Sequence, residues 1–259
     1  ILRDLGHLKE AGNCYCKAIE LNPLDKTIKN SLVDFLTIYE PEQFKSNKIN
    51  IINEEFKELN LTYQDNIIIT DNQAVKIYKD GLRIYRKYDL DLETSSSQIY
   101  KNNEDNFNCK RHMFIFNKHK IIPEFCFGCY KVQVEVDSIL ELIKLFLVFN
   151  KLELKNNNTR KSMVEVRPHI PGIYKGLIYC LDLNEALEIS QNLNILTKNN
   201  IRVDLTSKVK RGCSEYSLEF PKYKEVRKSG DQPMNYNENW RRIEKEIDKY
   251  KKDWAKPSK

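Results

Sequence analysis

The stretch Tyr130-Lys-Val-Gln-Val-Glu-Val136 decides how the second half of this 259-residue chain is expected to fold. Valine alternates with a polar residue, which is the period of two that a β-strand with one buried face produces. Ser138 follows, and its side chain can accept hydrogen bonds from the free amides of a first helical turn. The sequence therefore predicts a strand and then a helix from Ser138 to Asn150.

Further strands and helices are expected on both sides of this stretch. Residues 162–167 and 175–182 are predicted strands, 184–197 a helix, 201–205 a last strand, and 113–116 with 119–122 a small hairpin. From residue 130 onward the order is strand, helix, strand, strand, helix, strand. This order is that of the ferredoxin-like split βαβ unit, in which two helices cover one face of a four-stranded antiparallel sheet. The expected helix-facing residues are Val132, Val134, Val136, Val164, Val166, Ile201, Val203 and Leu205.

The opposite face of this sheet is expected to carry charges of both signs. Two explanations are open: solvent exposure with cross-strand ion pairs, or a face that binds a ligand. The candidate binding residues are Lys131, Gln133, Glu135, Glu165, Arg167, Lys175, Tyr179 and Arg202.

Two short pairs of metal-binding residues precede the first strand, Cys109-Lys-Arg-His112 and Cys126-Phe-Gly-Cys129. Pairs at this spacing are typical of structural zinc sites, because each pair clamps the ion from one tight turn. A second interpretation is an iron–sulfur cluster on Cys109, Cys126 and Cys129, with Cys213 as the fourth ligand. The third interpretation is coincidence.

The sequence does not settle whether the protein is an enzyme. It contains no glycine-rich phosphate loop and no His-Glu-x-x-His helix, and its neighbouring residues form no nucleophile–base pair. The proline-stiffened loop from Arg167 to Tyr174 is the best place for an active site, with His169, Tyr174 and Arg211 as candidate residues. The alternative is a rigid connection between two strands.

The N-terminal residues have a helical pattern instead. A turn glycine, a small residue, an aromatic, a second small residue and a closing proline follow in order, as Gly6, Ala11, Tyr15, Ala18 and Pro23. Residues 1–23 thus resemble the end of a tetratricopeptide repeat. Residues 25–39 continue as a helix that could begin a second, degenerate repeat or cap the stack. The resemblance implies a concave surface for a protein partner.

A shorter resemblance lies in Lys175-Gly-Leu-Ile-Tyr-Cys180 and Asn184-Glu-Ala-Leu187, which are similar to the third strand and second helix of an RNA-recognition motif. That family stacks bases on aromatic side chains of the open sheet face. Tyr179 matches one aromatic position, whereas Leu177 replaces another and the first strand offers no aromatic pair. The resemblance implies nucleic acid as a ligand of this face.

These patterns divide the chain into four parts. The expected parts are a helical repeat truncated at its N-terminus (1–45), a helical connector and polar linker (46–107), a metal-knuckle and ferredoxin-like domain (108–227), and a linker with an amphipathic helix (228–259). Within the connector, helices are expected near 51–59 and over 73–88, and a solvated linker over 93–108.

The amino-acid composition predicts the cellular compartment and the class of protein. Seven cysteines without regular disulfide spacing favour free or metal-bound thiols in a reducing, cytoplasmic compartment. No apolar run approaches the length of a bilayer span, and a net charge of +6 is mild. The sequence thus predicts an α+β binding or adaptor protein, with helical repeats for a protein partner and a zinc-braced domain with a second binding face. The alternative is a zinc or iron–sulfur enzyme that its repeats target.

Overall fold

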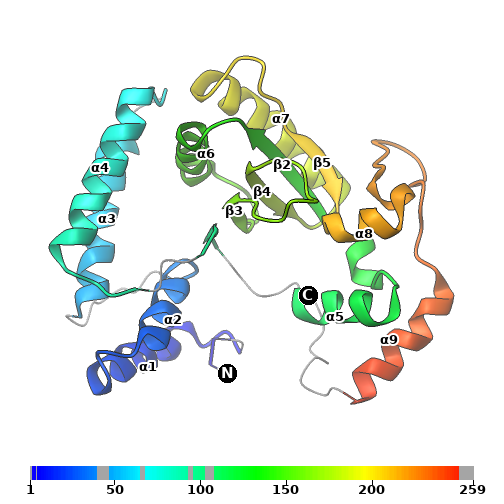
Figure 1. The fold of residues 1–259 in the computed structure, drawn as a ribbon, viewed down its shortest axis with the longest axis horizontal. Coiled ribbons are helices and arrows are strands. Elements are labelled where there is room, and N and C mark those ends of the chain that lie inside the picture. The colour runs from blue at the N-terminus through cyan, green and yellow to red at the C-terminus, as the bar shows by residue number, and fades with distance from the viewer. Residues whose placement is uncertain are drawn as a thin grey trace.

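The structure is a computed structural model that describes residues 2–3, 5–39, 47–64, 68–92, 96–102 and 108–250. It has the mixed α+β fold that the sequence predicts, with a helical part beside an antiparallel sheet (Figure 1). Within these residues, none of the helices combines the length and the apolar character that crossing a bilayer requires.

The helical part consists of α1 (Leu8–Leu21), α2 (Lys26–Leu36), α3 (Lys48–Gln64) and α4 (Asp71–Lys87). Asp25 starts α2 because its carboxylate accepts hydrogen bonds from the amides of Thr27 and Ile28. Between the helices Phe35 is fully buried, with the Tyr15 ring 5.1 Å away. The predicted helices at 25–39, 51–59 and 73–88 are confirmed.

The sheet contains β1 (Gln98–Lys101), β2 (Tyr130–Val136), β3 (Arg160–Val164), β4 (Tyr174–Cys180) and β5 (Lys208–Arg211). Its strand order is β1-β3-β4-β2-β5, and every neighbouring pair is antiparallel. Two helices, α6 (Ile139–Lys151) and α7 (Leu183–Asn200), pack on one face. As predicted, Ser138 caps α6 by accepting a hydrogen bond from the Glu141 amide.

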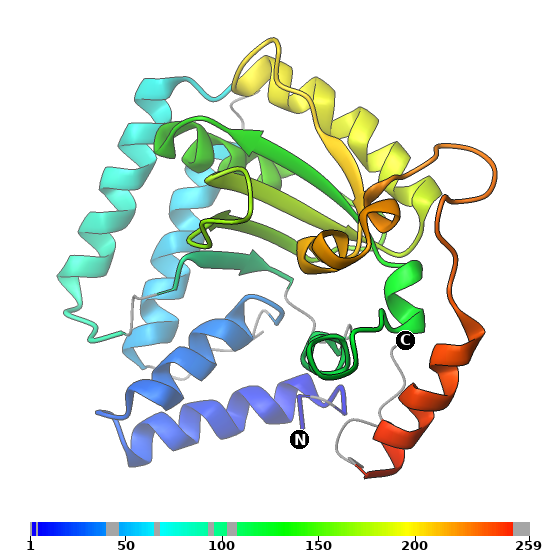
Figure 2. The ribbon, with the colours of Figure 1, turned by 45° about the vertical axis from the view of Figure 1, so that its right-hand side comes forward.

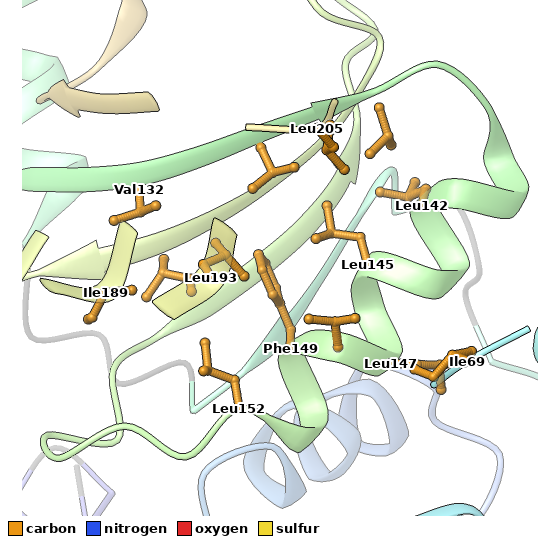
Figure 3. Packing of buried hydrophobic residues seen from close by; sticks show 14 of the residues in the cluster. Ile69, Val132, Leu142, Leu145, Leu147, Phe149, Leu152, Ile189, Leu193 and Leu205 are labelled. Carbon is orange, nitrogen blue, oxygen red and sulfur yellow. The ribbon is translucent and has the colours of Figure 1, made fainter. Parts of the chain in front are cut away.

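The main core lies between this face and the two helices (Figure 3). Val132, Leu145, Phe149, Ile178 and Leu193 are at most 2% exposed there. Residues Ile69 and Ala74 of the helical part belong to the same core, so α4 is attached to α6 by apolar packing.

Close packing of α6 depends on a glycine in β4. A β-carbon at Gly176 would lie 2.7 Å from both Leu145 Cδ2 and Phe149 Cζ. Only a residue without a side chain lets the helix approach the strand this closely.

Two segments that were predicted to be strands differ in the structure, one because it lies in a helix and the other because it follows a longer helix. Residues 113–116 and 119–122 do not form a hairpin, because α5 (Cys109–His119) contains 113–116 and ends at His119, and residues 120–122 form no strand. Its buried residues His112, Ile115 and Phe116 recur at helical spacing. Similarly, α7 extends to Asn200, so 201–205 is a turn that buries Leu205 and leaves Val203 79% exposed. The last strand is β5 instead.

Two further corrections concern the strands. The predicted solvated linker over 93–108 is wrong for Gln98–Lys101, because this segment pairs with β3 as an edge strand. Residues 93–95 and 103–107 lie outside the described part. β3 ends at Val164, so Val166 does not face the helices and is 72% exposed.

A second, smaller core lies beyond β5. It joins α5, a 3₁₀ turn η1 (Glu124–Phe127), α8 (Ser214–Glu219) and a 3₁₀ turn η2 (Pro221–Lys224). The predicted C-terminal helix is α9 (Glu238–Tyr250), and it docks on α5. Arg111 donates to Asp248 Oδ1 at 2.7 Å and to Glu244 Oε2 at 3.1 Å. The residues after Tyr250 lie outside the described part.

Candidate anion site and thiol set on the covered sheet face

The sheet face that points away from α6 and α7 carries most of the predicted binding residues. Lys131, Gln133 and Glu135 of β2 alternate with the buried valines, and Tyr179 and Lys175 of β4 stand opposite Lys131 and Glu135. This face is covered: Figure 2 shows α8 in front of the strands, with α5 below it. Lys131, Lys175 and Glu165 are only 6%, 3% and 8% exposed. Solvent exposure therefore does not explain the charges.

At one end of the face the charges are balanced. Glu165 accepts hydrogen bonds from Arg167 Nε at 2.7 Å and Nη2 at 2.8 Å, and pairs with Lys175 Nζ at 3.1 Å. Arg167 also pairs with Glu215 of α8. Two cations thus meet two carboxylates, and the Arg167 hydrogen bonds followed by Lys175 lower the pKa of Glu165 to about 2.

At the other end three lysines, Lys131, Lys161 and Lys210, have no such balance. Lys210 of β5 stands directly opposite Lys131 of β2 in the strand register. Within the described part of the chain none of the three forms an ion pair with a carboxylate. Lys131 Nζ lies 3.7 Å from Cys213 Sγ, Lys210 Nζ donates to Ser214 Oγ at 2.7 Å, and Lys161 Nζ lies 5.5 Å from the centre of the Tyr100 ring. Like charges opposite each other on neighbouring strands are destabilising, and burial increases their cost. We call Lys131, Lys161 and Lys210 the lysine set.

Burial and the neighbouring cations lower the pKa values of Lys161 and Lys210. Burial, followed by repulsion from Lys131 and Arg167, lowers the pKa of Lys161 to about 8. Burial and Lys131 likewise lower the pKa of Lys210 to about 8. Both side chains remain partly exposed, so a dissolved ligand can reach them. An anion between them would restore their charged forms, because an opposite charge favours protonation.

Four cysteines lie beside the lysine set. The Cys129 carbonyl accepts a hydrogen bond from Gly212 N at 2.8 Å, which brings Cys129 next to Cys213. Burial raises the pKa of Cys126 well above its usual value, and Cys129, Cys213 and Cys109 add to this electrostatically. We call Cys109, Cys126, Cys129 and Cys213 the thiol set.

The predicted zinc ligands do not form a compact group. Within the described residues no three His, Cys, Asp or Glu side chains are arranged to hold a metal ion. His112 is 2% exposed and stacks on Phe125 at 5.2 Å, and its buried Nε2 has no hydrogen-bond partner there. Burial lowers the pKa of His112 to about 4, so the ring is neutral at pH 7.

The other predicted site residues are dispersed. Arg202 lies off the sheet and pairs with Asp137, Glu141 and Asp204. Tyr174 packs against the main core, and His169 is exposed. Arg211 is 2% exposed, with its guanidinium 4.5 Å from the Tyr223 ring. The structure thus does not bring His169, Tyr174 and Arg211 together.

Two members of the lysine set were missed in the sequence. Lys161 lies in β3, which begins two residues before the predicted strand, and Lys210 lies in β5, where no strand was expected. A signal was present: lysine alternates with another residue in Lys208-Val-Lys210, and Lys161 continues the alternation of Met163 and Glu165.

An apolar cavity lies between the helical part and the β1 side of the sheet, and it includes Tyr100, the ring beside Lys161. It has a volume of about 840 Å³ and is lined by residues of the helical part, β1, α6 and β3, among them Phe56, Tyr85, Ile99 and Phe146. Its lining contains no Lys, Arg, His, Asp, Glu or Cys. Ionisable groups with shifted pKa values therefore lie outside the lining of the cavity, and these groups are the candidate site because they carry the chemistry.

Comparison with known proteins provides no relative from which a function could be transferred. No protein-family model, curated protein or solved structure matches this chain.

Proposed function

We propose that this chain is a binding protein whose covered sheet face binds a small oxyanion, such as a phosphate or carboxylate group, at the lysine set. The observation that carries the proposal is the register pair Lys131–Lys210, to which Lys161 adds a third cation that forms no ion pair with a carboxylate of the described residues. Although burial opposes it, Cys213, Tyr179 and Cys129 raise the pKa of Lys131. The charged forms of Lys161 and Lys210, by contrast, cost free energy in the absence of an anion, because burial and repulsion from Lys131 disfavour them. A bound anion would remove this cost and accept hydrogen bonds from the ammonium groups.

A small anion fits this site better than an RNA strand. Recognition of single-stranded RNA requires an open sheet face on which bases can stack. Here the Lys131 Nζ lies 4.8 Å from the Tyr179 ring centre and occupies its face, and Lys131 is itself buried. Partial exposure of Lys161 and Lys210 gives access to a group of a few atoms.

We also propose the finer fold assignments that the sequence suggested. The β2–α6–β3–β4–α7–β5 order and the strand sequence β5-β2-β4-β3 support a ferredoxin-like unit, to which β1 adds an edge. Gly6 has a φ of +81°, α1 packs against α2, and Ala11 is 4% exposed. These features support a tetratricopeptide-like module over α1 and α2, which would bind a protein partner and place the anion site in a complex.

Substitution of Lys161 by glutamine tests the proposed function. A hydrogen bond to a charged group contributes about 1.5–3 kcal/mol, so Lys161→Gln is expected to weaken phosphate binding at least about tenfold. Calorimetric titration of the full chain with inorganic phosphate, with chloride at matched ionic strength as the reference, measures the effect.

Lys198→Gln is the matched control, since Lys198 lies on an exposed position of α7, on the other side of the sheet. Equal phosphate affinity in all three proteins, or no phosphate binding by the wild type, would refute the anion site. Tight, salt-dependent binding of an RNA oligonucleotide without phosphate binding would favour the nucleic-acid interpretation instead.

A further inference from the structure

We infer that the apolar cavity binds the chain of a fatty acid, whose carboxylate lies at Lys101 in an adjoining polar pocket. The inference stands independently of the proposed anion site, because Lys131, Lys161 and Lys210 line neither space. The ligand would be apolar along most of its length and negatively charged at one end.

The apolar cavity has the size and the lining of a small-molecule site. Its volume of about 840 Å³ lies within the range of about 300–1,000 Å³ that is typical of such sites, and apolar side chains dominate its wall. The wall combines residues of α2, α3, α4, β1, α6 and β3. A hydrocarbon chain leaves water favourably for such a space, and each buried methylene strengthens binding up to about fourfold.

Several apolar side chains of this wall are exposed to solvent. Tyr78, Ile99 and Ile139 are 55%, 50% and 55% exposed. Ile99 stands opposite Ser162 in the strand register, and Ser162 stands opposite Gly176, against which α6 packs. Ile99 therefore lies on the helix side of the sheet, and it is half exposed there. A hydrocarbon chain in the cavity would remove these side chains from water.

A polar pocket of about 560 Å³ adjoins the apolar cavity. The two spaces share part of their walls, including Phe146 and Asn150. The polar pocket adds three lysines, Lys57, Lys101 and Lys151, and none of the described Asp or Glu residues lines it. One molecule that extends through both spaces would thus meet an apolar surface and then a positively charged one.

Lys101 lies where the two spaces meet. Its Nζ donates to the carbonyl of Asn150, which lines both spaces, at 3.0 Å. Lys101 stands directly opposite Arg160 of β3, whose guanidinium donates to the Leu152 carbonyl at 2.7 Å. Within the described part of the chain neither cation forms an ion pair with a carboxylate. Burial, followed by repulsion from Arg160, lowers the pKa of Lys101. A carboxylate beside Lys101 would compensate this pair of like charges.

A fatty acid matches both spaces, whereas simpler ligands match only one of them. A neutral apolar compound would fill the cavity and leave the charges of Lys101 and Arg160 uncompensated. A short anion would compensate the charges and leave the apolar wall in contact with water. The carboxylate of a fatty acid would accept a charge-assisted hydrogen bond from Lys101 while its chain fills the cavity.

Calorimetric titration of the full chain with dodecanoate, below the concentration at which it forms micelles, tests the inference. One molecule is expected to bind per chain. Octanoate is four methylenes shorter and is expected to bind about a hundredfold more weakly. Lys101→Gln keeps a donor for the Asn150 carbonyl but removes the charge. It is expected to weaken dodecanoate binding about tenfold and to leave the binding of dodecanol, which has no charge, unchanged. Lys198→Gln is again the matched control.

A second variant tests the place of the hydrocarbon chain. Ile99→Asn puts an amide into the wall of the cavity, and this amide would lose its water when a chain binds. The variant is expected to bind dodecanoate and dodecanol at least about fivefold more weakly. Val166→Asn is the matched control, because Val166 is 72% exposed and lines neither space. Circular dichroism checks that each variant is folded.

Four results would overturn the inference. The first is that the wild type does not bind dodecanoate, and the second is that it binds octanoate equally well. The third is equal dodecanoate affinity in the wild type and Lys101→Gln. The fourth is loss of dodecanoate binding in Lys161→Gln but not in Lys101→Gln, which would place the carboxylate at the lysine set. Dodecanoate binding that depends on Lys101 in a protein that does not bind phosphate would support the fatty-acid site and refute the anion site alone.

Discussion

Lys210→Glu is expected to abolish phosphate binding while it stabilises the fold. The substitution removes one of three cations and places a carboxylate directly opposite Lys131, so the site would repel an anion. Loss of a charged hydrogen bond and the added repulsion together are expected to reduce the phosphate affinity about a hundredfold or more. Opposite charges facing each other on neighbouring strands contribute about 0.2–1 kcal/mol, so the free energy of unfolding is expected to rise by a similar amount.

The two effects have opposite signs, which makes this prediction sharp. Calorimetry with inorganic phosphate measures the first effect, and urea unfolding of the full chain measures the second. Lys208→Glu is the matched control, because Lys208 lies on the same face of the same strand but is exposed and stands opposite Gln133. A Lys210→Glu protein that is less stable than the wild type and binds phosphate with unchanged affinity would contradict both the repulsion between Lys131 and Lys210 and their role in anion binding.

Gly176→Val is expected to produce the largest loss of stability. The new β-carbon would lie 2.7 Å from side-chain atoms of Leu145 and Phe149, both of which are fully or almost fully buried in the main core. Neither can move without displacing α6 from the sheet. Overpacking of this kind costs about 1–3 kcal/mol, and the branched side chain places this site at the upper end of that range or above it. Thermal and urea unfolding measure the change.

Gly128→Ala is the control for glycine replacement as such. Gly128 has a φ of −93°, which any residue can adopt, and a β-carbon there would meet only the Phe125 carbonyl oxygen, at 3.8 Å. We expect a change within about 0.5 kcal/mol. A Gly176→Val protein as stable as this control would contradict the close packing of α6 on β4.

Much of the fold could be predicted from the sequence because its signals are local. The alternation of β2 and the Ser138 cap of α6 each require only a few neighbouring residues, and both were confirmed. The errors arose in short apolar runs, whose pattern is compatible with both a helix and a strand. The pattern of Met113–Phe116 fits a strand as well as a helix. The helix is favoured only by tertiary packing, in which Ile115 and Phe116 belong to two different cores.

The candidate site was less predictable because it depends on register. Lys131 was identified from the alternation of its own strand, but Lys210 becomes its neighbour only when β5 pairs with β2. The burial of this face could not be predicted either, because Ser214 and Glu215 of α8 contact Lys210 and Arg167 only in the folded chain. The thiol set, with Cys213 as its fourth member, was among the alternatives, but its spacing could not show which cysteines lie close together. Cys213 approaches Cys129 through a hydrogen bond between distant strand ends, which no sequence spacing reveals.

The protonation of Lys161 tests the proposed oxyanion site most directly. In the free protein its pKa is about 8, against an ordinary value of 10.5, so the ammonium form is lost as the pH rises through 8. Because a bound anion favours that form, phosphate is expected to raise the pKa, and its affinity is expected to fall above pH 8. Carbon-13 NMR of the lysine ε-carbons, assigned with Lys161→Gln, follows this titration. An upward shift of the midpoint with saturating phosphate is the predicted result; an ordinary midpoint that phosphate leaves unchanged would contradict the account.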